Sequence, residues 1–442
     1  MKIIAIDEKE FVKKFRKENH EGFQAWIDEY DRAIAPALVA AGWKYETKAK
    51  RRVLFIHGDE EFKRRAYRRN GEWRYPVDER LGLEKNERYS REMLLQIARL
   101  STMMVYRRVP EVVEMMYGVY ITKDTVSKAV KLATQLFIER DEYHFYEEHQ
   151  GKKVETPVIY IEGDGVMIRT KIGLKNWTDM AHFVVHTGSE KVGKRRYKLQ
   201  NKREIISISH ADAKQKLEQC LSDYYHITDD TIFITNSDMG TGYGAKVFKE
   251  LVALFNVKRH EHFWDLYHLN KMIKNYFKKK STELMNLCFE SITTHDKGKM
   301  KLVLDEVESD YVDTDDEYEE FNYFKNRLLN NFQYTTPAEL RGLSNRGIGI
   351  MESQHRKITY RMKGRGMYWS LNGAQSMGRM IILEREDGLR ELFFGRWREE
   401  WEKLKNLPAT AGEYLKQIKS DGEGEYGGPR GTVHLVIGKP FR

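Results

Sequence analysis

Two aspartates at the ends of apolar runs are the residues whose surroundings first suggest chemistry. Asp164 ends the run in YIEGDG, and Asp238 ends the run in TNSDMG. Apolar runs rich in β-branched residues predict buried strands, so each aspartate is expected where the chain leaves a sheet into a glycine turn. Two carboxylates at adjacent strand ends can hold divalent cations, because Mg²⁺ prefers oxygen ligands. Aspartate also suits such turns through local hydrogen bonds, so either residue alone could be only a turn former.

A third carboxylate, Glu352, follows in the segment GIMESQHRKITYRMKGRG. A helix packed across the sheet could aim Glu352 at the two aspartates. Helical spacing also puts it on one face with Arg356, so a surface pair of these two residues is the alternative. Upstream, Asp265 and His268 lie three residues apart in HFWDLYHLNKMIK and could share a helix face. Taken alone, they are either a satisfied polar pair or half of a metal site.

The elements that must position these residues are predicted to alternate between strands and helices. The order is strand, strand, strand, helix, strand, helix, in the segments TPVIYIEGDG, VMIRT, AHFVVHTG, ADAKQKLEQCLSDYYHI, DDTIFITNSDMG and GYGAKVFKELVALF. This order predicts a mixed α/β fold rather than a purely parallel one. From about residue 270 to 339 the spacing is helical, without a strand signal, which predicts a helical segment that interrupts the α/β pattern.

The N-terminal third predicts helices and one small hairpin. Residues 1–50 predict one or two amphipathic helices, and the next thirty or so predict a hairpin with a turn at Asn70-Gly71. Two short helices follow, joined through GVYI, and resemble a helix-turn-helix. In that motif the second helix enters the major groove, which would point Lys123, Ser127 and Lys128 at base edges. A helical bundle unrelated to DNA produces the same pattern.

The composition limits the class of protein. The chain has 442 residues, of which 40% are hydrophobic, and this excludes a wholly disordered chain. It carries 76 Lys and Arg against 67 Asp and Glu, a formal net charge of +9 that favours an anionic partner such as a phosphate polymer. Its two cysteines are far apart, which excludes a disulfide framework or a CxxC-type zinc site and fits a reducing cytoplasm. We expect neither a signal peptide nor a membrane span.

The order of these parts resembles a known group of enzymes. The chain looks like the catalytic domain of DDE transposases of the broad Mutator-like set. The resemblance rests on the order Asp164, Asp238, the Asp265-x-x-His268 element, a helical insertion and Glu352. Over residues 50–400 the chain resembles bacterial insertion-sequence transposases of the ISLre type, most closely in IEGDGVMIRT, WDLYHLNKMI and MESQHRKITYRMKGRGMYWSLNGAQSMGRM. It departs from them in two places. The family often has Gly-Asp-Gly where this chain has NSDMG, and Gly-His where it has SQH after the glutamate.

The resemblance implies an α/β fold in which an RNase H-like mixed sheet is flanked by helices. It also implies an all-helical insertion and N-terminal helical DNA-binding modules. The corresponding ranges are 1–89 for a helical and small hairpin region, 90–150 for a helix-turn-helix-like domain, 151–269 and 341–420 for the two parts of the catalytic domain, 270–340 for the insertion, and 421–442 for a flexible tail.

The resemblance also implies a mechanism. Asp164, Asp238 and Glu352 would be the catalytic residues and would hold two Mg²⁺ ions, for which Mn²⁺ can substitute. Asp265 and His268 would be accessory residues. Lys123, Ser127 and Lys128 would bind DNA through the predicted helix-turn-helix. The basic side chains after the glutamate would bind the DNA backbone; these are Arg356, Lys357, Arg361, Lys363 and Arg365.

The implied partners are double-stranded DNA, both terminal inverted repeats and target, and further copies of the chain assembled on that DNA. The implied location is the bacterial cytoplasm, in association with the nucleoid. Two alternatives remain open: a metal-dependent nuclease that cuts without joining, and a DNA-binding regulator with an inactive nuclease fold.

Overall fold

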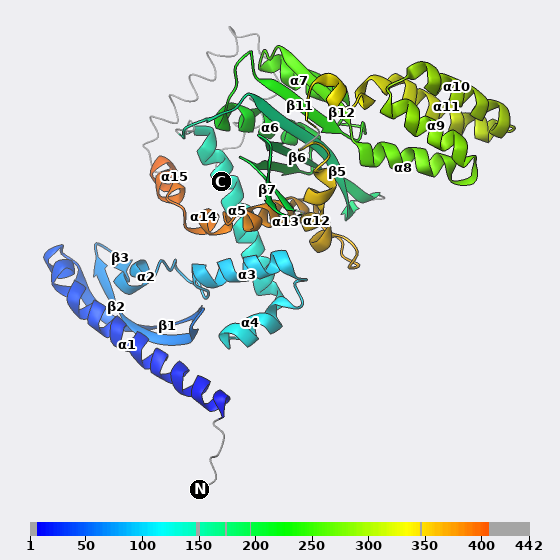
Figure 1. Ribbon diagram of the computed structural model, residues 1–442. Helices are drawn as coiled ribbons and strands as arrows, with labels where there is room; N and C mark the ends of the chain where they lie inside the picture. The colour runs from blue at the N-terminus through cyan, green and yellow to red at the C-terminus, as the bar shows by residue number, and fades with distance from the viewer. Residues whose placement is uncertain (1–6, 147–150, 173–174, 195, 345–346, 406–442) are drawn as a thin grey trace.

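A long helix and a small antiparallel sheet form the N-terminal part of the chain (Figure 1). The computed structural model describes residues 7–146, 151–172, 175–194, 196–344 and 347–405; the predicted tail, 421–442, lies outside these ranges. The first elements are α1 (Glu8–Ala40), β1 (Lys44–Phe55), β2 (Gly58–Arg69), β3 (Glu72–Arg74) and α2 (Pro76–Arg80). Asn70 and Gly71, both at positive φ, form the turn between β2 and β3, so the hairpin turn predicted there is confirmed.

Three helices follow: α3 (Arg91–Met103), α4 (Val109–Tyr117) and α5 (Lys123–Tyr146). Ser90 caps α3 by accepting a hydrogen bond from the Met93 amide. Gly118 ends α4 in the left-handed conformation, with φ of 64°. Buried side chains of all three helices pack in one cluster with side chains of the central sheet and the C-terminal helices. The predicted helix-turn-helix therefore shares its core with the rest of the molecule.

The central sheet is mixed, with the strand order β12-β11-β5-β6-β9. Its strands are β5 (Val158–Ile172), β6 (Lys175–His186), β9 (Arg203–Ser207), β11 (Ile232–Ser237) and β12 (Arg259–Trp264). β11 runs parallel to β5 and β12, whereas β6 runs antiparallel to β5 and β9. Two short pairs lie beside it: β4 (Val154–Glu155) with β10 (Tyr225–His226), and β7 (Ser189–Gly193) with β8 (Arg196–Leu199). The mixed α/β prediction is confirmed.

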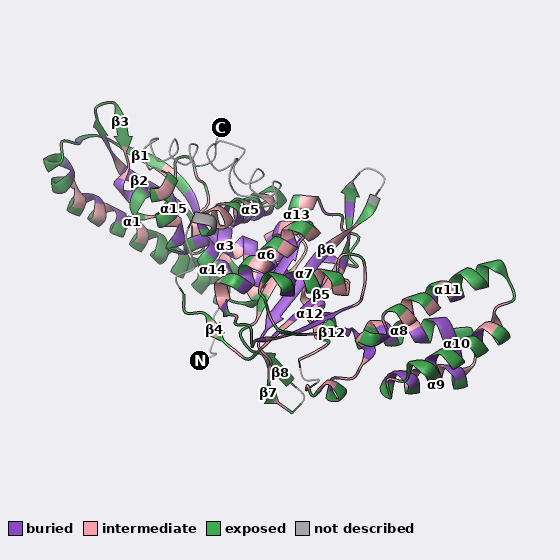
Figure 2. Ribbon diagram, turned by 90° about the horizontal axis from the view of Figure 1, so that it is seen from above, coloured by how far each residue is buried: buried purple, intermediate pink, exposed green. Residues whose placement is uncertain are grey.

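Helices cover both faces of this sheet, because its strands alternate between two apolar faces. Ile159 and Ile161 of β5 pack with α6 (His210–Tyr224) and α7 (Ala245–Leu254). Val166 and Ile168 point the other way, toward α5 and three further helices. These are α12 (Met351–Met362), α13 (Leu371–Arg385) and α14 (Leu389–Phe394), with α15 (Trp397–Lys405) beyond them. The strands are accordingly buried between two helical layers (Figure 2).

The prediction that Asp164 ends a strand is wrong. β5 continues to Ile172, so the segment VMIRT is its second half and not a separate strand. Gly163 and Gly165 suggested a turn, but both are paired with β6. Gly163 is required by close packing instead, because a Cβ built on it would lie 2.5 Å from the ring of Phe183. β9 and β12 were not among the predicted strands.

A helical segment follows β12 and projects from one edge of the sheet (Figure 1). It consists of α8 (Leu266–Tyr276), η1 (Phe277–Lys279), α9 (Thr282–Thr293), α10 (Lys297–Tyr311), α11 (Asp315–Asn330), η2 (Phe332–Thr335) and η3 (Glu339–Arg341). These helices bury a core of their own, including Phe321, Leu304 and Cys288. The prediction of helices here is confirmed. Within the described ranges, no helix has the length and apolar character needed to cross a membrane.

Candidate active site

Strand register places three aspartates at the same level of the sheet. In β5, β11 and β12, Gly163, Ser237 and Trp264 are paired across the sheet. An aspartate follows each of these paired residues. They are Asp164, Asp238 and Asp265. Because the three strands are parallel, all three aspartates lie at the same end of these strands. β11 and β12 end just before their aspartates, whereas β5 continues past Asp164 to Ile172.

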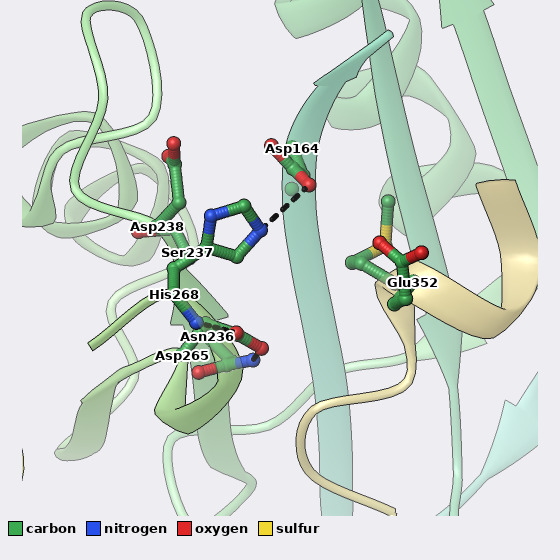
Figure 3. A pocket seen from close by; sticks show the side chains of 9 residues that line it. Asp164, Asn236, Ser237, Asp238, Asp265, His268 and Glu352 are labelled. Carbon is green, nitrogen blue, oxygen red and sulfur yellow. Dashed lines mark hydrogen bonds and ion pairs between the residues drawn. The ribbon is translucent and has the colours of Figure 1, made fainter. Parts of the chain in front are cut away.

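A pocket at this end of the strands collects every residue predicted to be catalytic or accessory (Figure 3). It is lined by Gly163, Asp164, Asn236, Ser237, Asp238, Asp265, His268, Met351 and Glu352. Figure 3 shows the His268 ring between Asp238 and Asp164, with Glu352 entering from α12 on the opposite side. Residues from four separate segments thus meet in one pocket.

Asp164 is held from two sides by histidines. Its Oδ2 lies 3.6 Å from His268 Nε2 and 3.6 Å from His355 Nδ1, and its Oδ1 accepts a hydrogen bond of 2.7 Å from the Gly165 amide. Burial alone would raise the pKa of Asp164, but its contacts with His268 and His355 and the hydrogen bond from the Gly165 amide outweigh burial, and the pKa is lowered. The contact with the Asp164 carboxylate raises the pKa of His268.

His355 was not among the predicted site residues, and it lies where the sequence departs from the family pattern. It is buried, on the inner face of α12, and burial lowers its pKa to about 4. Its ring stacks on that of His182, with centroids 5.2 Å apart. The available signal was its spacing: it follows Glu352 by three residues, as His268 follows Asp265.

Asp238 experiences the charge of Asp164. Its Oδ1 accepts a 2.7 Å hydrogen bond from the Gly240 amide, which closes a tight turn after β11. Burial raises the pKa of Asp238, and the negative charge of Asp164 raises it further. Two carboxylates that repel each other in a shared pocket are suited to a cation between them.

Asp265 and His268 have different roles in the structure. Asp265 is the N-cap of α8 and accepts a hydrogen bond of 3.0 Å from the His268 amide. Its other carboxylate oxygen accepts a 3.2 Å hydrogen bond from the Asn236 side chain. Asp265 is therefore a capping residue that also lines the pocket, while the His268 side chain reaches Asp164.

Glu352 is the second residue of α12, and its side chain is exposed at the pocket. Among the described residues of this helix, His355 and Lys357 form ion pairs and Glu352 does not. The alternative of a surface pair between Glu352 and Arg356 is thus not found in the structure.

The predicted DNA-binding residues are not all at the surface. Lys123, Lys128, Arg356 and Arg365 are exposed, and Ser127 and Lys363 are half-buried. The prediction is contradicted for Arg361, which is 1% exposed and donates a 2.7 Å hydrogen bond to the Ser101 carbonyl of α3. Lys357 is half-buried and pairs with Glu204 of β9, whose side chain is buried, so its charge is already partnered within the fold. The two residues are four apart on α12, and Arg361 points inward while Lys357 lies at the margin of the outer groove.

A second pocket lies on the outer face of α12, one turn along from Glu352. It is lined by Ser353, Arg356, Lys357, Tyr360 and Arg385. Arg356, Tyr360 and Arg385 are exposed, and the Arg365 guanidinium lies over the Tyr360 ring, 4.9 Å from its centroid. Arg385, on α13, was not predicted. Cations and an aromatic ring that line one groove can bind a phosphate chain and an unpaired base.

The donor chemistry of the first pocket suits a hard divalent cation, because Asp164, Asp238 and Glu352 all offer carboxylate oxygens. The side chains are not closed into a cage: within the described part of the chain, no three His, Cys, Asp or Glu residues form a preassembled metal site. Mg²⁺ commonly keeps several waters and only one or two protein carboxylates, so an open pocket of this kind fits it.

The curated relatives described here carry one family description. A 372-residue match in Streptococcus gallolyticus, "UPF0236 protein in vanSb 3'region", is 29% identical and covers 83% of this chain and 80% of that protein. A UPF0236 protein of Caldanaerobacter subterraneus is 25% identical over 414 residues, which cover 90% of this chain and 80% of the relative. Among solved structures, the Drosophila P element transposase strand transfer complex matches with a TM-score of 0.25 and 10% identity, over 72% of this chain and 83% of that chain. The model of the "Uncharacterised protein family (UPF0236)" matches residues 3–400, and the chain therefore belongs to this family.

Proposed function

We propose that this chain is a DDE transposase that binds the ends of an insertion sequence and carries out metal-dependent DNA cleavage and strand transfer. The observation that carries the proposal is the meeting of Asp164, Asp238 and Glu352 in one pocket, from β5, from the end of β11 and from α12. These are the three carboxylates that the family resemblance requires.

The sheet supports the finer assignment to an RNase H-like fold. In the order β12-β11-β5-β6-β9, β6 runs antiparallel to the other four strands, and the sheet lies between two helical layers. A helical segment interrupts the fold between β12 and α12, where the resemblance places an insertion.

In this proposal, Asp164, Asp238 and Glu352 would hold two Mg²⁺ ions. When bound, such ions activate water or a 3′-hydroxyl and stabilise the attacking and leaving oxygens of an in-line displacement. His268 and His355 contact the same oxygen of Asp164 and so restrict the orientation of its carboxylate. The lowered pKa of Asp164 keeps this group ionised at neutral pH.

Exposed basic residues support DNA as the substrate. Lys123 and Lys128 project from the first turns of α5, and Arg356 and Arg385 line the groove beside the pocket. A strand that runs along this groove would place its phosphates on the two arginines and a base against Tyr360. Joining two ends requires two bound ends, so we further propose an assembly of at least two copies on DNA, in the bacterial cytoplasm at the nucleoid.

The names of the relatives add a separate line of support. The name of one UPF0236 protein of Caldanaerobacter subterraneus lists several locus designations, all from a single strain. Several copies of a gene in one genome are expected of a mobile element.

The deciding experiment is a strand-transfer assay with Mg²⁺ and the DNA that flanks the gene on both sides. It compares the wild type, Asp164→Asn and, as a matched control, Asp230→Asn, which changes a carboxylate exposed far from the pocket. We expect joined product with the wild type and the control only. Cleavage without joining would favour the nuclease, and specific binding with no chemistry in any of the three proteins would favour the regulator.

A further inference from the structure

A buried carboxylate behind the pocket holds the start of the helix that carries Glu352. Glu162 lies on β5, two residues before Asp164, and is 1% exposed. Its Oε1 accepts a hydrogen bond of 2.7 Å from the Gly349 amide, and its Oε2 accepts one of 2.9 Å from the Ile350 amide. Glu162 is not among the residues that line the pocket.

These two amides immediately precede α12, whose first turn needs hydrogen-bond acceptors. Ile350 is the N-cap residue of α12 and makes no side-chain capping bond. The Glu162 side chain therefore accepts, from a neighbouring strand, the hydrogen bond of the N-cap amide that the glutamate of a capping box accepts within a helix. Gly349 presents its amide at φ of +80°, a conformation that favours glycine.

Burying this carboxylate costs desolvation energy, so stability alone does not explain its position. Within the described residues, Glu162 has no ion-pair partner, and its third donor is the Asn236 side chain at 3.2 Å. A buried carboxylate that relies on amide donors is a poor source of stability compared with an apolar side chain of similar size. What the arrangement provides is position: it ties the backbone two residues before Glu352 to the strand that carries Asp164.

The same group is linked to the other side of the pocket. Asn236 donates to Glu162 Oε2 and to Asp265 Oδ2, at 3.2 Å in each case. Asp265 caps α8, which carries His268. One hydrogen-bonded network thus joins β5 and β11 to the starts of α8 and α12.

We propose that Glu162 is a positioning residue that holds the N-terminus of α12 so that Glu352 faces Asp164. Glu162 itself contacts neither substrate nor metal. Its role in metal binding rests on the proposed function, because it assumes that Glu352 is a ligand; the anchoring of α12 does not depend on that assumption.

The test compares the wild type with Glu162→Gln, which keeps the shape of the side chain but presents an NH₂ group to a site lined by hydrogen-bond donors. Glu60→Gln is the matched control, since Glu60 is also buried, at 3% exposed, but lies on β2. The first measurement is hydrogen exchange in residues 347–355. We expect faster exchange of the Gly349 and Ile350 amides in Glu162→Gln alone, with slow exchange kept elsewhere in the sheet. Unchanged exchange at these amides would overturn the anchoring.

The second measurement is Mn²⁺ affinity, followed by electron paramagnetic resonance. We expect the dissociation constant to rise about 10-fold or more in Glu162→Gln, as for other groups that orient a metal ligand. In a Glu352→Gln background, the same change should have no further effect. Additive effects would overturn the positioning role. A wild type that binds no Mn²⁺ would overturn that role together with the proposed function, and the exchange result would still decide the anchoring.

Ile350→Pro gives an independent route if Glu162→Gln does not fold. It removes one of the two N–H donors and leaves the carboxylate in place, and φ of −92° at this position is within about 30° of the value that proline adopts. We expect faster exchange at Gly349 and weaker Mn²⁺ binding. Wild-type values for both would contradict the proposal.

Discussion

His268 Nε2 lies 3.6 Å from Asp164 Oδ2, which brings a side chain from the start of α8 onto the middle strand of the sheet. Because this contact orients Asp164, His268→Ala should reduce Mg²⁺-dependent cleavage by about 10- to 100-fold, the usual cost of losing a group that orients a metal ligand. DNA affinity should stay within about twofold of the wild type, because His268 is not on the basic surface. Cleavage rates and a gel-shift titration measure the two effects. Equal fold losses in cleavage rate and in DNA affinity would contradict the role of His268 in orienting Asp164.

Glu204 should make the fold sensitive to acid. Burial alone would raise its pKa, but the hydrogen bond from His182 and the charges of Lys357 and Lys202 hold the pKa well below its usual range. The stability that this group contributes is complete above the ordinary glutamate pKa of about 4.3 and is lost as the pH falls toward the lower value in the folded state.

Glu204→Gln should therefore lower the free energy of unfolding by about 3–5 kcal/mol at pH 7, because it leaves Lys357 half-buried beside a neutral group. The loss relative to the wild type should shrink below pH 4. Urea unfolding from pH 3 to pH 7 tests this. If the difference in the free energy of unfolding between the wild type and Glu204→Gln did not change with pH, the ionised pair of Glu204 and Lys357 would be refuted.

The groove on α12 should bind DNA mainly through phosphate charge. Removing Arg356 and Arg385 together should weaken binding uniformly across sequences, and should make the slope of log K against log salt less negative by about 0.9 for each phosphate that is no longer neutralised. Lys258→Ala is the control, since this lysine is already paired with Asp229. A salt slope equal to that of the wild type would exclude the groove from the DNA interface.

Gly163→Ala should destabilise the sheet next to the pocket. The added Cβ would lie 2.5 Å from Phe183 Cε1, so the ring must move, at a cost of about 1–3 kcal/mol. Gly244→Ala, with nothing within 4 Å of the added Cβ, is the matched control. Thermal unfolding of both variants provides the measurement. Equal midpoints would mean that the Phe183 ring yields without cost.

The sequence identified the carboxylates of the pocket because each has a local signal. Asp164 and Asp238 follow apolar, β-branched runs, and Glu352 starts an amphipathic segment. The path of β5 could not be predicted in the same way, because Gly163 and Gly165 resemble a turn locally and are explained only by the packing of β6.

The direction of side chains on α12 was also beyond local reasoning. Lys357 and Arg361 carry the same charge as Arg356 and Arg365, and the sequence does not tell which of them turn inward. That choice depends on two distant partners, Glu204 of β9 and the Ser101 carbonyl of α3. His355 escaped notice for the same reason, since its contact with Asp164 is made across the fold.

The bond from Arg361 to Ser101 ties α12 to α3, the helix that opens the predicted DNA-reading part of the chain. A tilt of α3 would either break this hydrogen bond, which would leave the buried Arg361 guanidinium without the Ser101 acceptor, or move α12 together with α3. Glu352 lies at the N-terminal end of α12, and Arg361 lies at its C-terminal end. If DNA binds the predicted DNA-reading helices as proposed, a shift of α3 on binding would therefore be transmitted through α12 to Glu352.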